Sequence, residues 1–131
     1  MKSGVSFRTV ATCGIPGETM TEQAISPKRL KELDQLCAKL NLSCGRMGLL
    51  HEALTHSSHA SENAEGNDYE KLEFFGDAVL KFVVSEYLLD RFPEYNEGQL
   101  TEIRAVLVID KVLAEIARNI GLDRFILLGK Q

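Results

Sequence analysis

Apolar residues along the chain recur at the three- and four-residue spacing of helices and predict a series of amphipathic helices. Ser26-Pro27 begins the first, because serine caps helices well and proline suits the first turn; this helix should end near Asn41. A shorter helix is expected from Met47 to His56. The segment Ser57–Asn67, rich in Ser, Asn and Glu, predicts a loop.

A longer helix of a different kind is predicted from about Asp68 to Arg91, because its apolar residues leave no wide polar face. We therefore expect it to be buried on nearly all sides. Phe92-Pro93 should end it, and two more helices should follow the turn at Glu94–Gly98. The last of them has Asp110 as its predicted cap and Gly121 as its predicted stop.

Composition favours a single all-α domain. A chain of 131 residues holds about one domain, and ten Gly and three Pro are few for a strand-and-turn architecture. We expect a poorly ordered tail over residues 1–25 and the folded domain over residues 26–131. No apolar run approaches the roughly 20 residues that span a bilayer, and the start lacks a secretory signal, so we expect a cytoplasmic protein without a membrane partner.

Neither cysteines nor histidines predict a zinc site. The cysteines are odd in number without a C-x-x-C spacing, which favours reduced thiols, and no H-E-x-x-H motif is present, which favours cap or turn roles for the histidines. The residues concerned are Cys13, Cys37, Cys44, His51, His56 and His59.

Charge is distributed unevenly along the chain. Residues 51–100 hold three basic and eleven acidic side chains, whereas residues 27–50 hold five basic and two acidic ones. No cluster of Lys and Arg is present, although phosphate contacts draw on such clusters. A nucleic-acid function therefore requires something that offsets the acidic segment, and metal ions could do so.

Three carboxylates share one face of the predicted long helix. Glu70, Glu73 and Asp77 stand at positions i, i+3 and i+7, within an arc of roughly 60°. On a buried helix they would repel one another and lose hydration, and Lys81 offers one compensating charge. Oxygen ligands at this spacing suit Mg²⁺ or Mn²⁺, and hydrolysis of a phosphodiester is the chemistry that such a metal would support.

The segment Tyr69–Leu80, YEKLEFFGDAVL, closely resembles the signature of the ribonuclease III family. Further similar segments occur in the family's order at Glu52–Ser58, Phe92-Pro93, Asn96–Thr101 and Arg104–Val108, so that the resemblance covers about residues 28–130. It implies an all-α, ribonuclease III-type endonuclease domain. Members of this family typically act as homodimers that cut both strands of double-stranded RNA, which they recognise largely by shape.

The resemblance also implies roles for individual residues. Glu73 corresponds to the family's metal-binding glutamate, and Asp77 to its catalytic, metal-holding aspartate. Glu70 and Glu97 match further acidic positions with supporting roles, and Phe74 matches the aromatic residue of the dimer interface. The implied cofactor is Mg²⁺, with Mn²⁺ as a substitute.

The sequence departs from the family's pattern at its C-terminal end. In the family a later helix with an Ala-Asp-x-x-Glu-Ala pattern completes the site, and a double-stranded RNA-binding domain commonly follows; the sequence stops before both, at Gly129-Lys130-Gln131. We therefore expect a C-terminally incomplete domain, which is either a truncated ribonuclease III or a fold without the last helix and with little activity. The intact set of four acidic residues favours truncation.

Two alternatives to a nuclease stay open. One is a non-catalytic scaffold of the same fold, an RNA-binding or ribosome-associated dimer, which the missing carboxylates favour and the intact acidic face disfavours. The other is an ordinary helical bundle whose acidic residues form salt bridges. The natural RNA is equally open, since a ribosomal precursor, a messenger and a regulatory duplex all fit.

Overall fold

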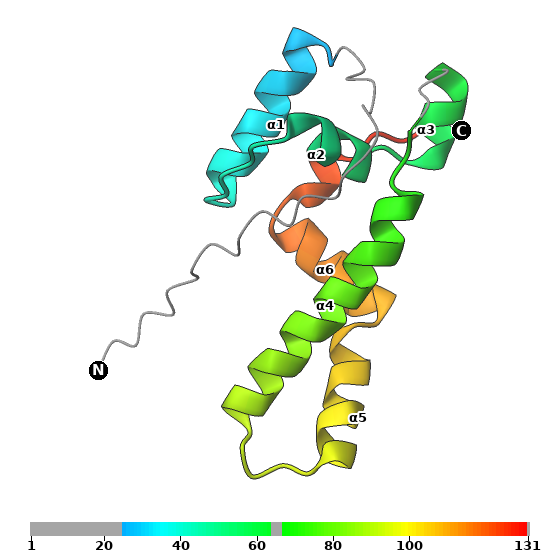
Figure 1. Cartoon of the computed structure of the whole chain (residues 1–131). Helices are drawn as coiled ribbons and strands as arrows, with labels where there is room; N and C mark the ends of the chain where they lie inside the picture. Colours follow the sequence, from blue (N-terminus) through cyan, green and yellow to red (C-terminus); the bar gives the residue numbers. More distant parts are fainter. Residues whose placement is uncertain (1–24, 64–66, 131) are drawn as a thin grey trace, which may run out of the picture.

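The computed structural model describes residues 25–63 and 67–130, and the predicted tail at residues 1–25 lies outside this part except for its last residue. The described part is all-helical, as predicted (Figure 1). It also contains an isolated β-bridge between Thr55 and Leu127. Its elements are α1 (Pro27–Lys39), α2 (Met47–Ala53), α3 (Ser57–Asn63), α4 (Glu70–Arg91), α5 (Glu97–Leu107), α6 (Asp110–Asn119) and the 3₁₀ helix η1 (Leu122–Phe125). None of the described helices is long and apolar enough to cross a membrane.

Helix α1 begins as its sequence predicts. The hydroxyl of Ser26 accepts a hydrogen bond from the backbone N–H of Arg29 at 3.2 Å, and Pro27 occupies the first turn. The helix ends at Lys39, slightly before the expected Asn41, because Asn41 takes a left-handed conformation with φ of 53° that ends the helical path.

The predicted loop at residues 57–67 is wrong in its first half, where α3 forms instead. His56 accepts a hydrogen bond from the backbone N–H of Ser58 through Nδ1 at 3.1 Å, and so caps this helix in the kind of role expected for the histidines. The hydroxyl of Ser61 donates to the main-chain oxygen four residues earlier, and Ala60 is buried. The cap contact stabilises a helix that hydrophobic spacing does not reveal.

A small core joins the first two helices to η1. Leu33, Leu36 and Leu54 are buried, and their partly buried neighbours are Leu40, Met47, Leu50, Leu122 and Phe125. The segment after η1 runs back along this core, since Leu127 donates to the oxygen of Leu54 and accepts from the N–H of His56. Residues near the C-terminal end of the described chain therefore pair with the residues immediately before α3.

Helices α4 and α5 form a long antiparallel hairpin that extends away from this core (Figure 1). A capping box begins α5, because Asn96 and Gln99 each accept a hydrogen bond from the other's backbone N–H. Arg104 of α5 donates to the hydroxyl of Ser85 of α4 at 2.8 Å, which fixes how the two helices align. After α6, Gly121 takes the left-handed conformation expected of a stop, with φ of 67°. Asp110 is the first residue of α6, and its predicted cap position belongs to Ile109.

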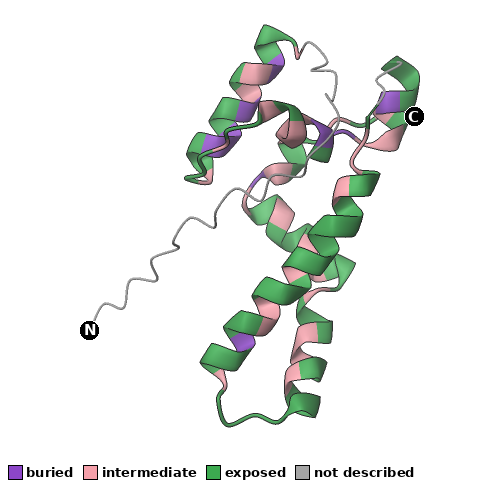
Figure 2. Cartoon of the chain, in the orientation of Figure 1, coloured by how far each residue is buried: buried purple, intermediate pink, exposed green. Residues whose placement is uncertain are grey.

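The expectation that the long helix is buried on nearly all sides is wrong for the described residues of a single chain. Leu88 is the buried residue of α4, and Figure 2 shows most of the helix in the colour of exposed residues. Phe74, Phe75 and Phe82 are 85%, 66% and 69% exposed. Helices α5 and α2 contact α4 on part of its surface, so apolar side chains on the rest of the helix stay uncovered.

Candidate active site

The first turn of α4 is held in place by the segment that precedes α3. Thr55 is buried, and its main-chain oxygen accepts a hydrogen bond from the N–H of Tyr69 at 3.0 Å. The carboxylate of Asp68 accepts from the N–H of Glu70 at 3.0 Å, which satisfies one of the donors at the start of the helix. These contacts set the position from which the acidic residues of α4 project.

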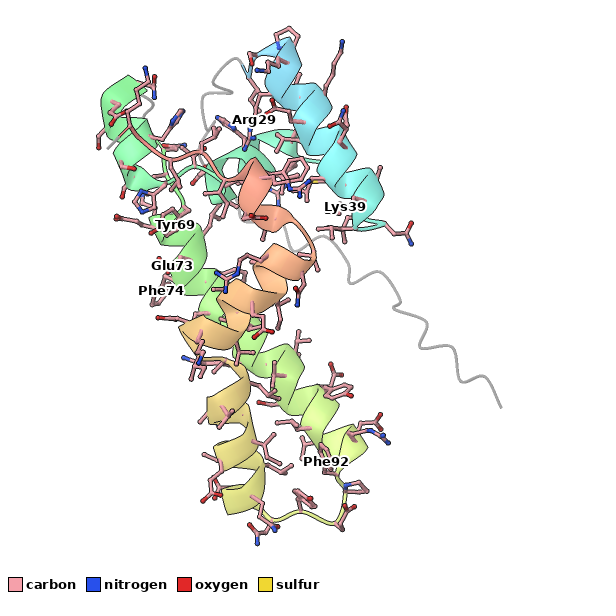
Figure 3. All side chains as sticks on the ribbon, turned by 180° about the vertical axis from the view of Figure 1, so that it is seen from behind. Arg29, Lys39, Tyr69, Glu73, Phe74 and Phe92 are labelled. Carbon is pink, nitrogen blue, oxygen red and sulfur yellow. The ribbon has the colours of Figure 1, made fainter. Side chains whose placement is uncertain are left out.

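Glu70, Glu73 and Asp77 lie along one face of α4, as their spacing predicts. Tyr69, Glu73 and Phe74 occupy the end of α4 that is close to the core (Figure 3). All three carboxylate residues are exposed in the described chain. The loss of hydration expected for a buried helix is therefore absent here, and their exposure leaves them accessible to a cation and to a polyanionic substrate.

The pKa of Tyr69 reflects the negative charge at this end of the helix. Burial raises the pKa of this phenol above its ordinary value, and the carboxylates of Glu73, Glu70 and Asp68 raise it further. Both effects favour the protonated form of the phenol. Its ring also contacts that of His56, with the ring centroids 5.4 Å apart.

Asp77 is paired with Lys81 one turn further along α4. Lys81 Nζ donates to Asp77 Oδ2 at 2.6 Å, and both side chains are about half exposed. An exposed pair at this spacing stabilises a helix only slightly. Its importance is therefore local, because it places an ammonium group on one oxygen of the carboxylate predicted to be catalytic.

Glu97 is not brought to the same place as the other acidic residues. It begins α5, where its carboxylate accepts a hydrogen bond from the hydroxyl of Thr101 at 3.0 Å. The rise from Glu73 to the end of α4 at Arg91 is about 27 Å at 1.5 Å per residue, and Glu97 follows the turn beyond that end. Its supporting role stays a prediction that the geometry of one chain does not support.

The donor chemistry at the acidic face fits a hard divalent cation, but the set of protein ligands is small. The described residues include no group of three or more His, Cys, Asp or Glu side chains arranged to hold a metal. Mg²⁺ is commonly bound by one or two carboxylates, with water and substrate oxygens as its other ligands. Glu73 and Asp77, one turn apart on an exposed face, match that requirement.

Two residues that organise the site were not identified from the sequence. Thr55 positions α4 through a backbone oxygen, and Asp68 caps the helix; neither role depends on hydrophobic spacing. A tertiary contact to the main chain leaves no periodic pattern in the sequence. An Asp two residues before the acidic helix is a signal that could have identified Asp68 as an acceptor for the first N–H group of the helix.

Comparisons with known proteins agree on one family. The family model described as Ribonuclease-III-like matches residues 47–131. Similar curated proteins include Ribonuclease 3 of Legionella pneumophila, 46% identical over 98 residues that cover 75% of this chain and 42% of the relative. Ribonuclease 3 of Oleidesulfovibrio alaskensis is 55% identical over 83 residues, which cover 63% of this chain and 36% of the relative.

Solved structures agree with the sequence comparisons. The crystal structure of the nuclease domain of ribonuclease III from Campylobacter jejuni is similar, with a TM-score of 0.66 and 40% identity over 76% of this chain and 65% of that one. A second structure of the same domain, described as having structural flexibility in the region involved in dimer formation, gives a TM-score of 0.67 and 40% identity over 74% of this chain and 65% of that one. The chain spans less than half the length of the curated relatives that it matches.

Proposed function

The chain belongs to the ribonuclease III family, and on that premise we propose that it is an endoribonuclease domain that cuts double-stranded RNA with Mg²⁺ as cofactor. The observation that carries the proposal is the exposed face of α4 on which Glu73 and Asp77 lie one turn apart. Because the chain spans only part of its relatives, we propose the activity for the nuclease domain to which these residues belong.

Glu73 and Asp77 would both be ligands of the cation in this proposal. Glu73 and Asp77 would hold the cation between them, with Asp77 as the catalytic residue and Glu70 in support at the start of the same face. A Mg²⁺ ion bound there would supply an acidified water and neutralise charge on the scissile phosphate. The backbone of α4, held by Thr55 through Tyr69, would keep both carboxylates on the same face of the helix.

The substrate we propose is an RNA duplex recognised by its shape, with its phosphates drawn to the cation at an otherwise acidic surface. Residues 27–50, which run from the start of α1 into α2, carry five basic and two acidic side chains, and this net positive charge suits the same polyanion. Processing of cellular RNA, including ribosomal precursors, is the role that this chemistry favours, and we propose the cytoplasm as its location.

A homodimer is the assembly that we propose for the active protein. Phe74, 85% exposed, lies beside the acidic face on a helix whose apolar surface is largely uncovered. A side chain of this size stabilises an assembly mainly when a partner buries it. The Campylobacter jejuni nuclease domain, described as having a region involved in dimer formation, supports the same arrangement for this chain.

A non-catalytic, RNA-binding or ribosome-associated scaffold is the second candidate. It is favoured by the small ligand set, since the described residues hold no group of three or more metal-ligating side chains. A scaffold would need no exposed pair of carboxylates at the start of α4. Cleavage therefore separates the two functions directly.

The test is incubation of a long labelled RNA duplex, and of one of its single strands, with Mg²⁺, with Mn²⁺ or with a chelator. The chain is assayed as it stands and also extended with the segment of the Legionella pneumophila relative that follows the matched region, where the family resemblance predicts the second acidic helix. We expect metal-dependent cutting of the duplex and much slower cutting of the single strand. If both proteins bind the duplex and neither cuts it, the nuclease proposal fails and the scaffold replaces it.

A further inference from the structure

The ion pair between Lys81 and Asp77 places a fixed positive charge at the proposed metal site. Glu73 stands one turn before Asp77 on α4 and Lys81 one turn after it, so Asp77 lies between the other proposed ligand and an ammonium group. Lys81 Nζ is 2.6 Å from Asp77 Oδ2. That oxygen therefore already accepts a hydrogen bond from Lys81.

The position of Lys81 is reinforced by the neighbouring helix. Its main-chain oxygen accepts a hydrogen bond from the hydroxyl of Ser85 at 2.6 Å, and Ser85 in turn accepts one from Arg104 of α5. The turn of α4 that carries Lys81 is therefore packed against α5. The backbone of Lys81 is therefore held in place, and its ammonium group lies close to Asp77.

We propose that Lys81 is a positioning residue that competes with a divalent cation for the carboxylate of Asp77 and lowers the metal affinity of the site. The inference rests on the proposed function, because it needs Asp77 to be a metal ligand. Two effects act in the same direction. A cation that takes Asp77 Oδ2 must displace the ammonium group, and the displaced ammonium group still repels the cation from a short distance.

The size of the effect follows from the exposure of the pair. Solvent weakens the interaction of half-exposed charges, so removal of the Lys81 charge should tighten metal binding about two- to fivefold. A purely structural role for the ion pair would instead lower the helix stability slightly and leave metal affinity unchanged. Metal affinity is therefore the quantity that distinguishes the two roles.

The experiment is a titration of the isotope-labelled chain with Mn²⁺, followed by NMR as paramagnetic broadening of the backbone amides around Asp77. Lys81→Gln removes the charge, Lys81→Arg keeps it, and Lys71→Gln removes a charge from the same helix about 120° around from Asp77. Asp77→Asn reports whether the broadening depends on the carboxylate. Circular dichroism checks that each variant keeps its helices.

We expect Lys81→Gln to bind Mn²⁺ about two- to fivefold more tightly than the unchanged chain, while Lys81→Arg and Lys71→Gln bind as it does. Equal affinity of Lys81→Gln and the unchanged chain would overturn this inference alone, as would an equal gain in Lys71→Gln. Broadening that persists in Asp77→Asn, or that is absent from every variant, would overturn both this inference and the proposed metal site.

Discussion

At the scale of single residues, Arg29 ties three elements together through one buried guanidinium group. It donates to the main-chain oxygen of Phe125 in η1 at 2.7 Å, to Nδ1 of His51 in α2 at 3.4 Å, and to Glu32 in its own helix at 3.2 Å. A charged group removed from water is tolerated when several acceptors surround it. These contacts hold the core on which α4 is mounted.

Arg29→Met should lower the free energy of unfolding by about 1–3 kcal/mol, because the oxygen of Phe125 loses its donor in a partly buried place. Urea denaturation followed by circular dichroism measures the change. Lys28→Met, at the exposed position next to it, is the matched control and should have little effect. Equal stability of the two variants would contradict this role of Arg29.

Tyr69 should make the stability of the chain sensitive to alkaline pH. Since folding raises its pKa, the folded chain keeps the phenol proton to higher pH than the unfolded chain does. This contribution is complete below the unfolded pKa of about 10 and is lost as the pH rises through the folded pKa. Melting temperatures from about pH 8 to about pH 11 should therefore fall less steeply for Tyr69→Phe than for the exposed control Tyr87→Phe.

At the scale of helices, the sequence predicted those features that depend on the spacing of neighbouring residues. The start of α1 at Ser26, the turn after Arg91 and the shared face of Glu73 and Asp77 all follow from the residues themselves. Helix α3 did not, because a histidine cap at its start and the burial of Ala60 against the rest of the fold leave no pattern of hydrophobic spacing. The burial of α4 was also mispredicted, since apolar residues indicate that a face will be covered but not which molecule covers it.

A substitution at Gly76 tests whether the surface of α4 at this position is uncovered in the monomer. A Cβ atom at this position would meet nothing within 4 Å in the described chain, so Gly76→Ala should stabilise α4 by about 0.5–1 kcal/mol. Thermal unfolding at a low chain concentration measures this gain. A clear loss of stability under those conditions would mean that Gly76 already has a close neighbour in the monomer.

At the scale of the whole molecule, the small core and the uncovered hairpin differ sharply in packing. The core joins α1, α2 and η1, whereas large apolar side chains of α4 remain exposed (Figure 2). Exposed apolar surface of this extent favours association with another molecule. The proposed homodimer would bury part of it next to the acidic face.

Phe74→Ala should weaken self-association at least about tenfold and change the stability of the monomer little, because Phe74 is 85% exposed in one chain. Sedimentation equilibrium over a range of concentrations gives the dimer dissociation constant. Leu128→Ala, which removes another exposed apolar side chain outside α4, is the control. The interface role of Phe74 is wrong if both variants associate like the unchanged chain or weaken equally.

Metal-dependent cleavage by a paired set of variants tests the central claim most directly. Asp77→Asn and Asp90→Asn make the same change on α4 at positions about 140° apart around the helix. Measured as initial rates of duplex RNA cleavage in Mg²⁺, Asp77→Asn should lose activity at least about a hundredfold, because it removes a ligand of the cation, while Asp90→Asn should keep it. Equal rates for the two variants would contradict the assignment of the acidic face of α4 as the catalytic site.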